Sequence, residues 1–273
     1  MQKRALLIND LSGVGRCSLT VAIPIISALG IETSVIPTAV LSTHTGGFEG
    51  YTFHDLTENM LPMAQHWHKL NLHFDAIYCG YLGSERQIEI VKKIISLLKS
   101  DDTVIIVDPV MADFGELYDN FKPDFPEKLK PLCDIADIIV PNITEACLLT
   151  NTPYEHGHTT DFATRLLHNL KSCVNAENIL LTGVCDGHNK VGAGCCSQGK
   201  TEFKFAQQVK GAYYGSGDEF CSAMCAKLLQ SGDFLQSEQT AVEFTSKCIK
   251  RTLDAGVDTR YGVIFEPEIK NLL

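Results

Sequence analysis

The stretch Gly211-Ala-Tyr-Tyr-Gly-Ser-Gly-Asp-Glu-Phe220 runs directly into a segment rich in Ala and Cys whose apolar residues have helical spacing. Gly215 and Gly217 can adopt backbone angles that are closed to other residues, so the N–H groups around Ser216 can point into one concavity. The positive end of the following helix adds to this concavity, which suits the charge on a phosphoryl group in transfer. Asp218 is then placed to accept a proton from an attacking hydroxyl. On this stretch alone, an ordinary glycine-serine loop with Asp218 as the helix N-cap is an equal alternative.

Short apolar runs upstream of this stretch alternate with longer segments of helical period. The runs predict buried strands over residues 5–8, 34–37, 76–79, 104–107, 138–140 and 179–181. The periodic segments predict helices over residues 18–29, 85–98, 160–170, 217–229 and 238–253. Strands that alternate with helices indicate an α/β fold with a mainly parallel central sheet and helices on both faces.

One region breaks this alternation. Residues 190–193 and 201–205 are strand-like and flank Gly-Cys-Cys-Ser-Gln-Gly-Lys, in which Gly199 is available for a turn. We expect an antiparallel hairpin there, near one edge of the parallel sheet. Because the sequence has no internal repeat, low-complexity tract or linker, we expect a single domain over residues 1–273.

Composition limits the classes of function. The formal charge of −10 over 273 residues argues against a nucleic-acid partner, which needs a basic surface. Eleven cysteines are present without a CxxC pair, so reduced and mostly buried thiols are favoured over disulfides or a zinc site. The apolar run near the N-terminus is too short for a signal peptide, and no stretch approaches the ~20 apolar residues of a membrane helix. We therefore expect a cytoplasmic protein with no membrane partner.

Polar residues follow three of the predicted strands, at the edge where an open α/β sheet binds its ligands. Asp108, fixed by a following proline, is either a turn former or a carboxylate near Mg²⁺ or phosphates. Asn142 and Glu145 lie in Pro-Asn-Ile-Thr-Glu, which is either a helix-capping arrangement or a site for a metal-bound water. Thr182 and Gly183 can offer a hydroxyl and N–H groups to the phosphates of ATP.

The order of these motifs resembles the ribokinase-like superfamily, over nearly the whole chain. The glycine–small hydroxyl–glycine–aspartate motif of that family matches Gly215-Ser-Gly-Asp218, its Asp-Pro-Val-Met motif matches 108–111, and its Pro-Asn-x-x-Glu motif matches 141–145. The resemblance implies a three-layer fold in which the first motif supplies the base and the anion hole. It also implies that the third motif helps to place Mg²⁺.

The N-terminal half resembles the vitamin B6 kinase branch of that superfamily, the pyridoxal and pyridoxamine kinases. Ser42-Thr-His44-Thr45-Gly46 is similar to a Ser-Asn-His-Thr segment whose threonine contacts the pyridine substrate in those kinases. Gly80-Tyr81-Leu-Gly-Ser84 is similar to a segment whose tyrosine lies at the substrate pocket.

The resemblance also places the first loop of the chain at the substrate. It implies substrate contacts for Asp10, Ser12, His44, Thr45 and Tyr81. Asp10 departs from the family, because many B6 kinases have a serine there, and this bears on the preferred vitamer. Without the resemblance, Asp10-Leu-Ser12-Gly-Val-Gly15 reads as a turn that enters a helix, with a carboxylate free to bind a polar ligand.

These similarities imply an ATP-dependent kinase for the 5′-hydroxymethyl group of pyridoxal, pyridoxamine or pyridoxine. The implied co-substrate is ATP with Mg²⁺, with K⁺ as an optional monovalent cation, and the implied assembly is a homodimer.

Three alternatives remain at this point. A hydroxymethylpyrimidine or hydroxymethylpyrimidine phosphate kinase shares Asp-Pro-Val-Met and the glycine-rich site, but usually has Gln or Met where this chain has His44-Thr45. A sugar kinase is third, because no obvious lid-forming strands follow the first strand-helix unit. A ligand sensor that has kept the fold and lost catalysis is disfavoured by the intact Gly215, Gly217 and Asp218.

Overall fold

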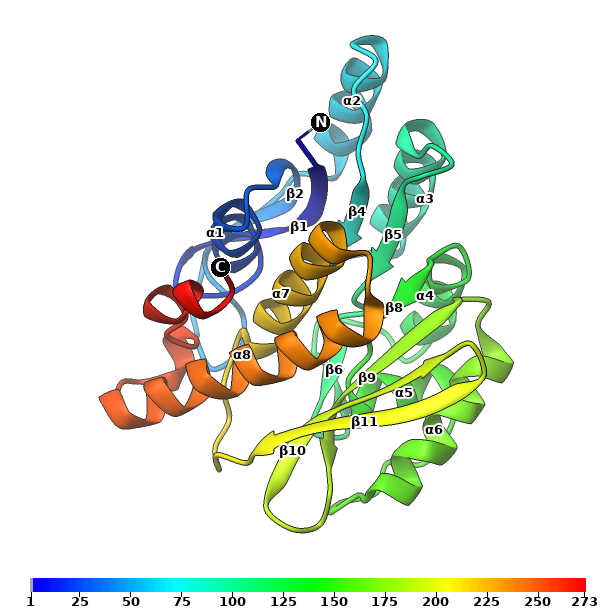
Figure 1. Cartoon of the computed structure of the whole chain (residues 1–273). Helices are drawn as coiled ribbons and strands as arrows, with labels where there is room; N and C mark the ends of the chain where they lie inside the picture. The colour runs from blue at the N-terminus through cyan, green and yellow to red at the C-terminus, as the bar shows by residue number, and fades with distance from the viewer. Residues whose placement is uncertain (1) are drawn as a thin grey trace.

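The computed structural model describes residues 2–273, which fold around one nine-stranded sheet (Figure 1). The strand order is β11-β10-β9-β8-β5-β4-β1-β2-β3. The six strands from β9 to β2 in this order pair in parallel, while β10 and β11 at one edge and β3 at the other are antiparallel. The strands of this sheet are β1 (Arg4–Val14), β2 (Glu32–Thr43), β3 (Phe53–Asp55), β4 (Ala76–Cys79), β5 (Val104–Val107), β8 (Ile138–Ile139), β9 (Asn178–Cys185), β10 (Lys190–Ser197) and β11 (Lys200–Gln207). The short strands β6 (Ala112–Asp113) and β7 (Glu116–Leu117) form a separate pair.

Helices cover both faces of the sheet. Figure 1 shows α7 and α8 crossing one face together with α1, while α3 to α6 lie behind the sheet. The helices are α1 (Leu19–Ala28), α2 (Thr57–Lys69), α3 (Glu85–Leu98), α4 (Phe125–Cys133), α5 (Ile143–Thr150), α6 (Thr160–Cys173), α7 (Ser216–Ser231) and α8 (Phe234–Ala255), followed by the 3₁₀ turns Thr259–Tyr261 and Glu266–Asn271. The expected three-layer α/β fold is therefore confirmed.

A hydrophobic core lies on each side of the sheet. One core joins the sheet to α2–α6, and the other joins it to α1, α7 and α8. Helix α3 shows why the sequence packs in this way. Its side chains at spacings of three and four, from Ile88 to Leu98, are buried, and each stabilises the fold by roughly 1.5–3 kcal/mol. Ser84 accepts a hydrogen bond from the N–H of Gln87 and so begins the helix at the predicted residue.

The first two strands are longer than the sequence predicted. β1 continues through Asp10 and Ser12 to Val14, and β2 continues to Thr43, so the predicted turn at residues 10–15 is wrong. The ladder between them shifts register between Asn9 and Leu11, which lets a polar segment extend the strand without following its apolar period.

The hairpin is confirmed, but its turn is much tighter than the predicted seven-residue connection. β10 continues through Cys195 and Cys196, whose side chains are buried. The chain reverses at Gln198-Gly199, where both residues have positive φ (49° and 75°), as a two-residue hairpin turn requires.

Two further findings concern the whole described chain. The eleven cysteines in residues 2–273 are free thiols, and nine of them are buried, as expected. Over the same residues, no helix combines the length and apolar character needed to cross a membrane.

Candidate active site

The glycine-rich loop before α7 is held against the segment that follows β1. Gly215 is the N-cap of α7 and has a φ of 75°, and a Cβ there would lie 2.0 Å from the carbonyl oxygen of Arg16. Only glycine fits this position, because both the backbone angle and the close approach exclude a side chain. Ser216 begins the helix and donates its hydroxyl to the carbonyl oxygen of Tyr213 at 2.9 Å.

Gly217 differs from what the sequence predicted. It lies in the first turn of α7 without a positive φ, and a Cβ there would meet nothing within 4 Å. Of the two glycines, Gly215 needs a backbone conformation that other residues rarely adopt, whereas Gly217 does not. The N–H groups of residues 216–218 have no partner within the helix, as in every first turn, and the N–H of Ser216 donates to the carbonyl oxygen of Tyr213 at 3.4 Å.

Asp218 is not the cap of its own helix. It occupies the third helical position, and its carboxylate accepts hydrogen bonds from the N–H of Ser18 at 2.8 Å and from the amide of Asn9 at 3.2 Å. Burial raises the pKa of Asp218 to about 6, against the lowering effect of these two donors, and the nearby Asp10 charge raises it further. A carboxyl with this pKa is mostly ionised at neutral pH and is close to the range that suits a general base.

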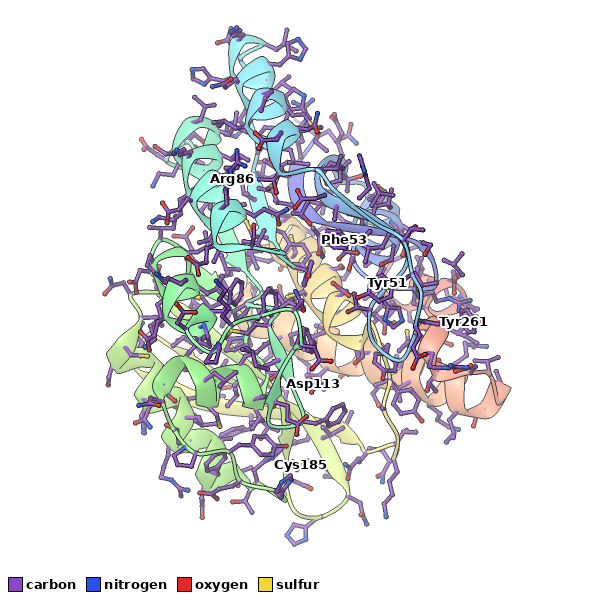
Figure 2. The ribbon with its side chains drawn as sticks, turned by 180° about the vertical axis from the view of Figure 1, so that it is seen from behind. Tyr51, Phe53, Arg86, Asp113, Cys185 and Tyr261 are labelled. Atoms are coloured by element: carbon purple, nitrogen blue, oxygen red, sulfur yellow. The ribbon has the colours of Figure 1, made fainter. Side chains whose placement is uncertain are left out.

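A cavity of about 460 Å³ opens beside Asp218. Its lining includes the nine predicted catalytic, nucleotide and metal residues: Asp108, Asn142, Glu145, Thr182, Gly183, Gly215, Ser216, Gly217 and Asp218. Val242 and Ile249 of α8 supply an apolar wall. Asp113 and Cys185, which also line the cavity, lie on the same side of the molecule in Figure 2. The ends of β5, β8 and β9 and the start of α7 thus meet around one space large enough for a nucleotide.

Asp108 and Glu145 are two buried carboxylates in this cavity that oppose each other's ionisation. Burial raises the pKa of Asp108 well above its usual value, and the Asp218 charge raises it further. Burial also raises the pKa of Glu145, and the Asp108 charge raises it further. Such a pair fits a divalent cation, because a cation would offset both the burial and the mutual repulsion. In residues 2–273 no three His, Cys, Asp or Glu side chains gather closely enough to hold a metal, so phosphates and waters would complete the coordination.

Glu145 also has the capping role that the sequence left open. Asn142 accepts a hydrogen bond from the N–H of Glu145 at 2.9 Å, and Glu145 accepts one from the N–H of Asn142 at 2.8 Å. Its second oxygen accepts a bond from the N–H of Met111 at 3.2 Å, which fixes the loop after β5. The capping box thus holds the carboxylate beside Asp108, and both interpretations of Glu145 are compatible.

Thr182 and Gly183 end the regular parallel part of β9. The N–H of Thr182 donates to the carbonyl oxygen of Pro141 at 2.9 Å, which aligns this strand end with Asn142. Gly183 has a φ of 77°, and its carbonyl oxygen is 3.0 Å from Nε2 of His158. Both residues line the cavity.

Two of the predicted substrate residues, Asp10 and Ser12, lie on β1, and Ser18 lies between Asp10 and Asp218. Asp10 is buried and accepts hydrogen bonds from the hydroxyls of Ser12 at 2.9 Å and Ser18 at 2.5 Å. Burial raises the pKa of Asp10, while the two hydroxyl donors oppose the rise. Because Ser18 also donates its N–H to Asp218, the side chains of Asp10 and Asp218 are linked through Ser18.

The other three predicted substrate residues lie on the segments that follow β2 and β4. Tyr81 donates its N–H to the side-chain oxygen of Asn9 at 2.9 Å, and burial, helped by the Asp10 charge, raises its pKa to about 12. His44 lies 5.1 Å from the ring of Tyr214, and its Nε2 is 2.5 Å from the carbonyl oxygen of Arg260. Thr45 is exposed on the turn after β2. None of the five predicted substrate residues is among those that line the 460 Å³ cavity in the described chain.

Two residues at the centre of the site were missed by the sequence analysis. Asn9 binds Asp218 through its amide nitrogen, and Tyr81 and the N–H of Asp10 through its oxygen. A Cβ on Gly80 would lie 2.4 Å from this amide, so that glycine lets Asn9 pack against the strand end. Ser18 binds Asp218 and Asp10. The polar pair Asn9-Asp10 directly after an apolar run was the one available signal for Asn9.

Comparison with known proteins agrees with this geometry. The profile of a family described as phosphomethylpyrimidine kinase matches residues 23–262. A Bacteroides thetaiotaomicron protein described as a phosphomethylpyrimidine kinase, in a crystal form with pyridoxal, is 35% identical with a TM-score of 0.93, and the match covers 100% of this chain and 96% of that one. Pyridoxal kinase from Lactobacillus plantarum is 27% identical with a TM-score of 0.91, over 100% and 97% of the two chains. A pyridoxine/pyridoxal/pyridoxamine kinase from Bordetella avium is 28% identical over 257 residues, which is 88% of this chain and 80% of that protein.

The family match covers well over half of the chain and includes the cavity and the glycine-rich loop. The chain therefore belongs to the phosphomethylpyrimidine kinase family, in its ribokinase-like pyridoxal kinase branch, and is a small-molecule kinase.

Proposed function

We propose that the chain transfers the γ-phosphoryl group of ATP to the 5′-hydroxymethyl group of a vitamin B6 vitamer, with Asp218 as the base. The observation that carries the proposal is the position of Asp218. Its carboxylate lines the nucleotide-sized cavity and is also linked through Ser18 to Asp10. A hydroxyl bound between Asp10 and the cavity would lie within reach of Asp218.

The residues of the site would divide the work of phosphoryl transfer. Asp218 would orient the hydroxyl and accept its proton, since little covalent chemistry falls to the protein in a loose transition state. The N–H groups that follow Gly215 would stabilise the charge on the transferred group. Thr182 and Gly183 would hold the nucleotide phosphates, and Val242 and Ile249 would pack against the adenine ring.

Asp108 and Glu145 would hold Mg²⁺, Glu145 in part through water. When bound, the ion would supply neutralisation of the phosphate charge. Asn142 would keep Glu145 in place through the capping box. The raised pKa values of both carboxyls support this assignment, because each has burial and a like charge as its main causes.

On the vitamer side, Asp10 would face a hydrogen-bond donor of the ring or its substituents, with Ser12 and Ser18 fixing its rotamer. Tyr81, Thr45 and His44 would surround the ring. Support for a B6 vitamer comes from the crystal form with pyridoxal of a protein 35% identical to this chain.

The second candidate is a hydroxymethylpyrimidine kinase, or a kinase for its phosphate. The description of the matching family favours it, as does that of the same Bacteroides protein. Asp10 is compatible with either substrate, because a carboxylate accepts equally from a protonated pyridine and from an aminopyrimidine.

A coupled assay of ADP formation with pyridoxal, pyridoxamine, pyridoxine and hydroxymethylpyrimidine tests the proposal. We expect turnover with at least one B6 vitamer at a higher kcat/KM than with hydroxymethylpyrimidine. A higher kcat/KM for the pyrimidine would favour the second candidate, and no turnover with any of the four would contradict both.

Four further expectations belong to the same proposal: a single domain over residues 1–273 and a cytoplasmic location, both from the sequence, and a homodimer and stimulation by K⁺, both from the resemblance. The molar mass from light scattering during gel filtration tests the homodimer. Replacement of K⁺ by Na⁺ in the assay tests whether K⁺ stimulates the rate.

A further inference from the structure

Ser18 has a backbone conformation that serine rarely adopts. Its φ is 54° and its ψ is −129°, a region that glycine occupies readily and that a Cβ makes costly. The residue is 7% exposed and directly precedes α1. A serine in that place normally caps its helix, but the Ser18 side chain makes no capping hydrogen bond. Other contacts must therefore stabilise this strained backbone conformation of Ser18.

Those contacts join two carboxylates. The backbone N–H of Ser18 donates to Oδ2 of Asp218 at 2.8 Å, and its hydroxyl donates to Oδ1 of Asp10 at 2.5 Å. The second oxygen of Asp10 accepts from the hydroxyl of Ser12 at 2.9 Å. Hydrogen bonds to charged acceptors are among the stronger ones, so both can hold a strained backbone.

The orientation of this N–H depends on the strained angles. A rotation of Ser18 toward ordinary β or helical angles would turn its N–H away from Asp218, which lies on another element. The neighbouring segment leaves little room for compensation, because Gly215 packs directly on the carbonyl of Arg16. The hydroxyl bond to Asp10 is thus the contact that favours the angle at which the N–H meets Asp218.

We propose that Ser18 is a positioning residue that couples the vitamer pocket to the base, holding Asp10 with its hydroxyl and Asp218 with its backbone N–H. The proposal rests on the proposed function for its kinetic consequence, whereas the coupling itself is a property of the ligand-free protein. A vitamer that engages Asp10 would fix Ser18 more firmly, and so fix the base when the acceptor hydroxyl is present.

Ser18→Gly and Ser18→Ala form a matched pair, because both remove the hydroxyl and only alanine keeps the strain. Glycine adopts the observed angles without cost, so the N–H should still meet Asp218. We expect Ser18→Gly to retain most of kcat but to raise the vitamer KM about 10-fold, as for a lost hydrogen bond to a charged group. Ser18→Ala should raise KM similarly and also lower kcat by about 10-fold, because the N–H turns away from the base. An equal kcat in the two variants would overturn the proposal.

A ligand-free measurement separates this inference from the proposed function. In an Asp10→Ala background the Ser18 hydroxyl has lost its acceptor, so Ser18→Gly should raise the Tm by relieving strain. In the wild-type background the same change also breaks the Asp10 bond, so its gain in Tm should be smaller. The same change in Tm in both backgrounds would overturn the coupling, even if no vitamer is turned over. Absence of turnover by the wild-type protein, with unequal changes in Tm, would contradict only the proposed function.

Discussion

The carboxylate of Asp218 accepts a 2.8 Å hydrogen bond from the backbone N–H of Ser18, 200 residues earlier in the chain. Because the side chain is held by β1 and its following segment, it does not cap its own helix. The carboxylate therefore stays at the edge of the cavity, where the proposed function requires the base.

The two glycines of the phosphate loop should respond differently to alanine. Gly215→Ala places a Cβ 2.0 Å from the carbonyl oxygen of Arg16 at a positive φ, and should destabilise the fold by more than about 2 kcal/mol. Gly217→Ala meets no protein atom within 4 Å and should fold normally, while its methyl group faces the cavity and raises the KM for ATP. Melting curves and ATP kinetics on both variants check this. A large loss of Tm in Gly217→Ala would contradict the placement of that residue in regular helix.

Glu145→Gln should raise the Mg²⁺ concentration needed for half-maximal rate, because a buried carboxylate beside Asp108 is replaced by an amide. The variant keeps one acceptor for the capping box, so its free energy of unfolding should change by only about 1 kcal/mol. Mg²⁺ titrations of rate and a melting curve distinguish the two effects. An unchanged Mg²⁺ requirement with a lower Tm would leave Glu145 as a helix cap alone.

Thr45→Val should raise the KM for the vitamer and leave that for ATP unchanged. The side chain lies on the turn after β2, away from the nucleotide cavity. Loss of a hydrogen bond to a ring atom would weaken binding by ~1–3 kcal/mol. Initial rates with each substrate varied in turn are the measurement. A change confined to the KM for ATP would remove Thr45 from the vitamer pocket.

The pH dependence follows from the raised pKa of Asp218. The base must be ionised to accept a proton, so kcat should fall as the pH drops below about 6. The contribution of Asp218 to the free energy of unfolding changes in the opposite direction and falls as the pH rises. The folded pKa of about 6 is above the unfolded value of ~3.9, so the contribution of Asp218 is fully present below the unfolded value and is lost as the pH rises through 6.

Asp218→Asn removes this ionisation and provides the test. The Tm of the variant minus that of the wild type should be larger at about pH 8 than at about pH 5. A constant difference in Tm across this range would show that Asp218 does not titrate in it.

Local sequence patterns predicted that three polar residues would meet at one edge of the sheet, and all three line the cavity. Asp108, Asn142 and Thr182 each follow a short apolar run, and the carboxyl ends of parallel strands share one edge of the sheet. Helix α3 was predicted with its observed bounds, because its apolar spacing is regular and Ser84 is a good cap.

The missed elements have short or interrupted patterns. Helix α2 buries only Thr57, Met60 and Ala64 and contains Pro62. Helix α4 buries apolar residues at helical spacing, from Phe125 to Cys133, but it is only nine residues long and contains two prolines. The extension of β1 is polar and depends on pairing with β2 across a register shift. The Ser18 contact uses a backbone N–H, which no residue type encodes, and bridges elements far apart in the chain.

Replacement of Asp218 by Asn, followed by measurement of kcat with saturating ATP and vitamer, tests the central claim most directly. Asn retains the shape and one acceptor for the Ser18 N–H but cannot take the proton of the attacking hydroxyl. We predict a loss of at least ~100-fold in kcat, or about 2.7 kcal/mol, with the KM for ATP nearly unchanged and a folded protein. A variant that keeps more than about a tenth of the wild-type kcat would contradict the assignment of Asp218 as the base.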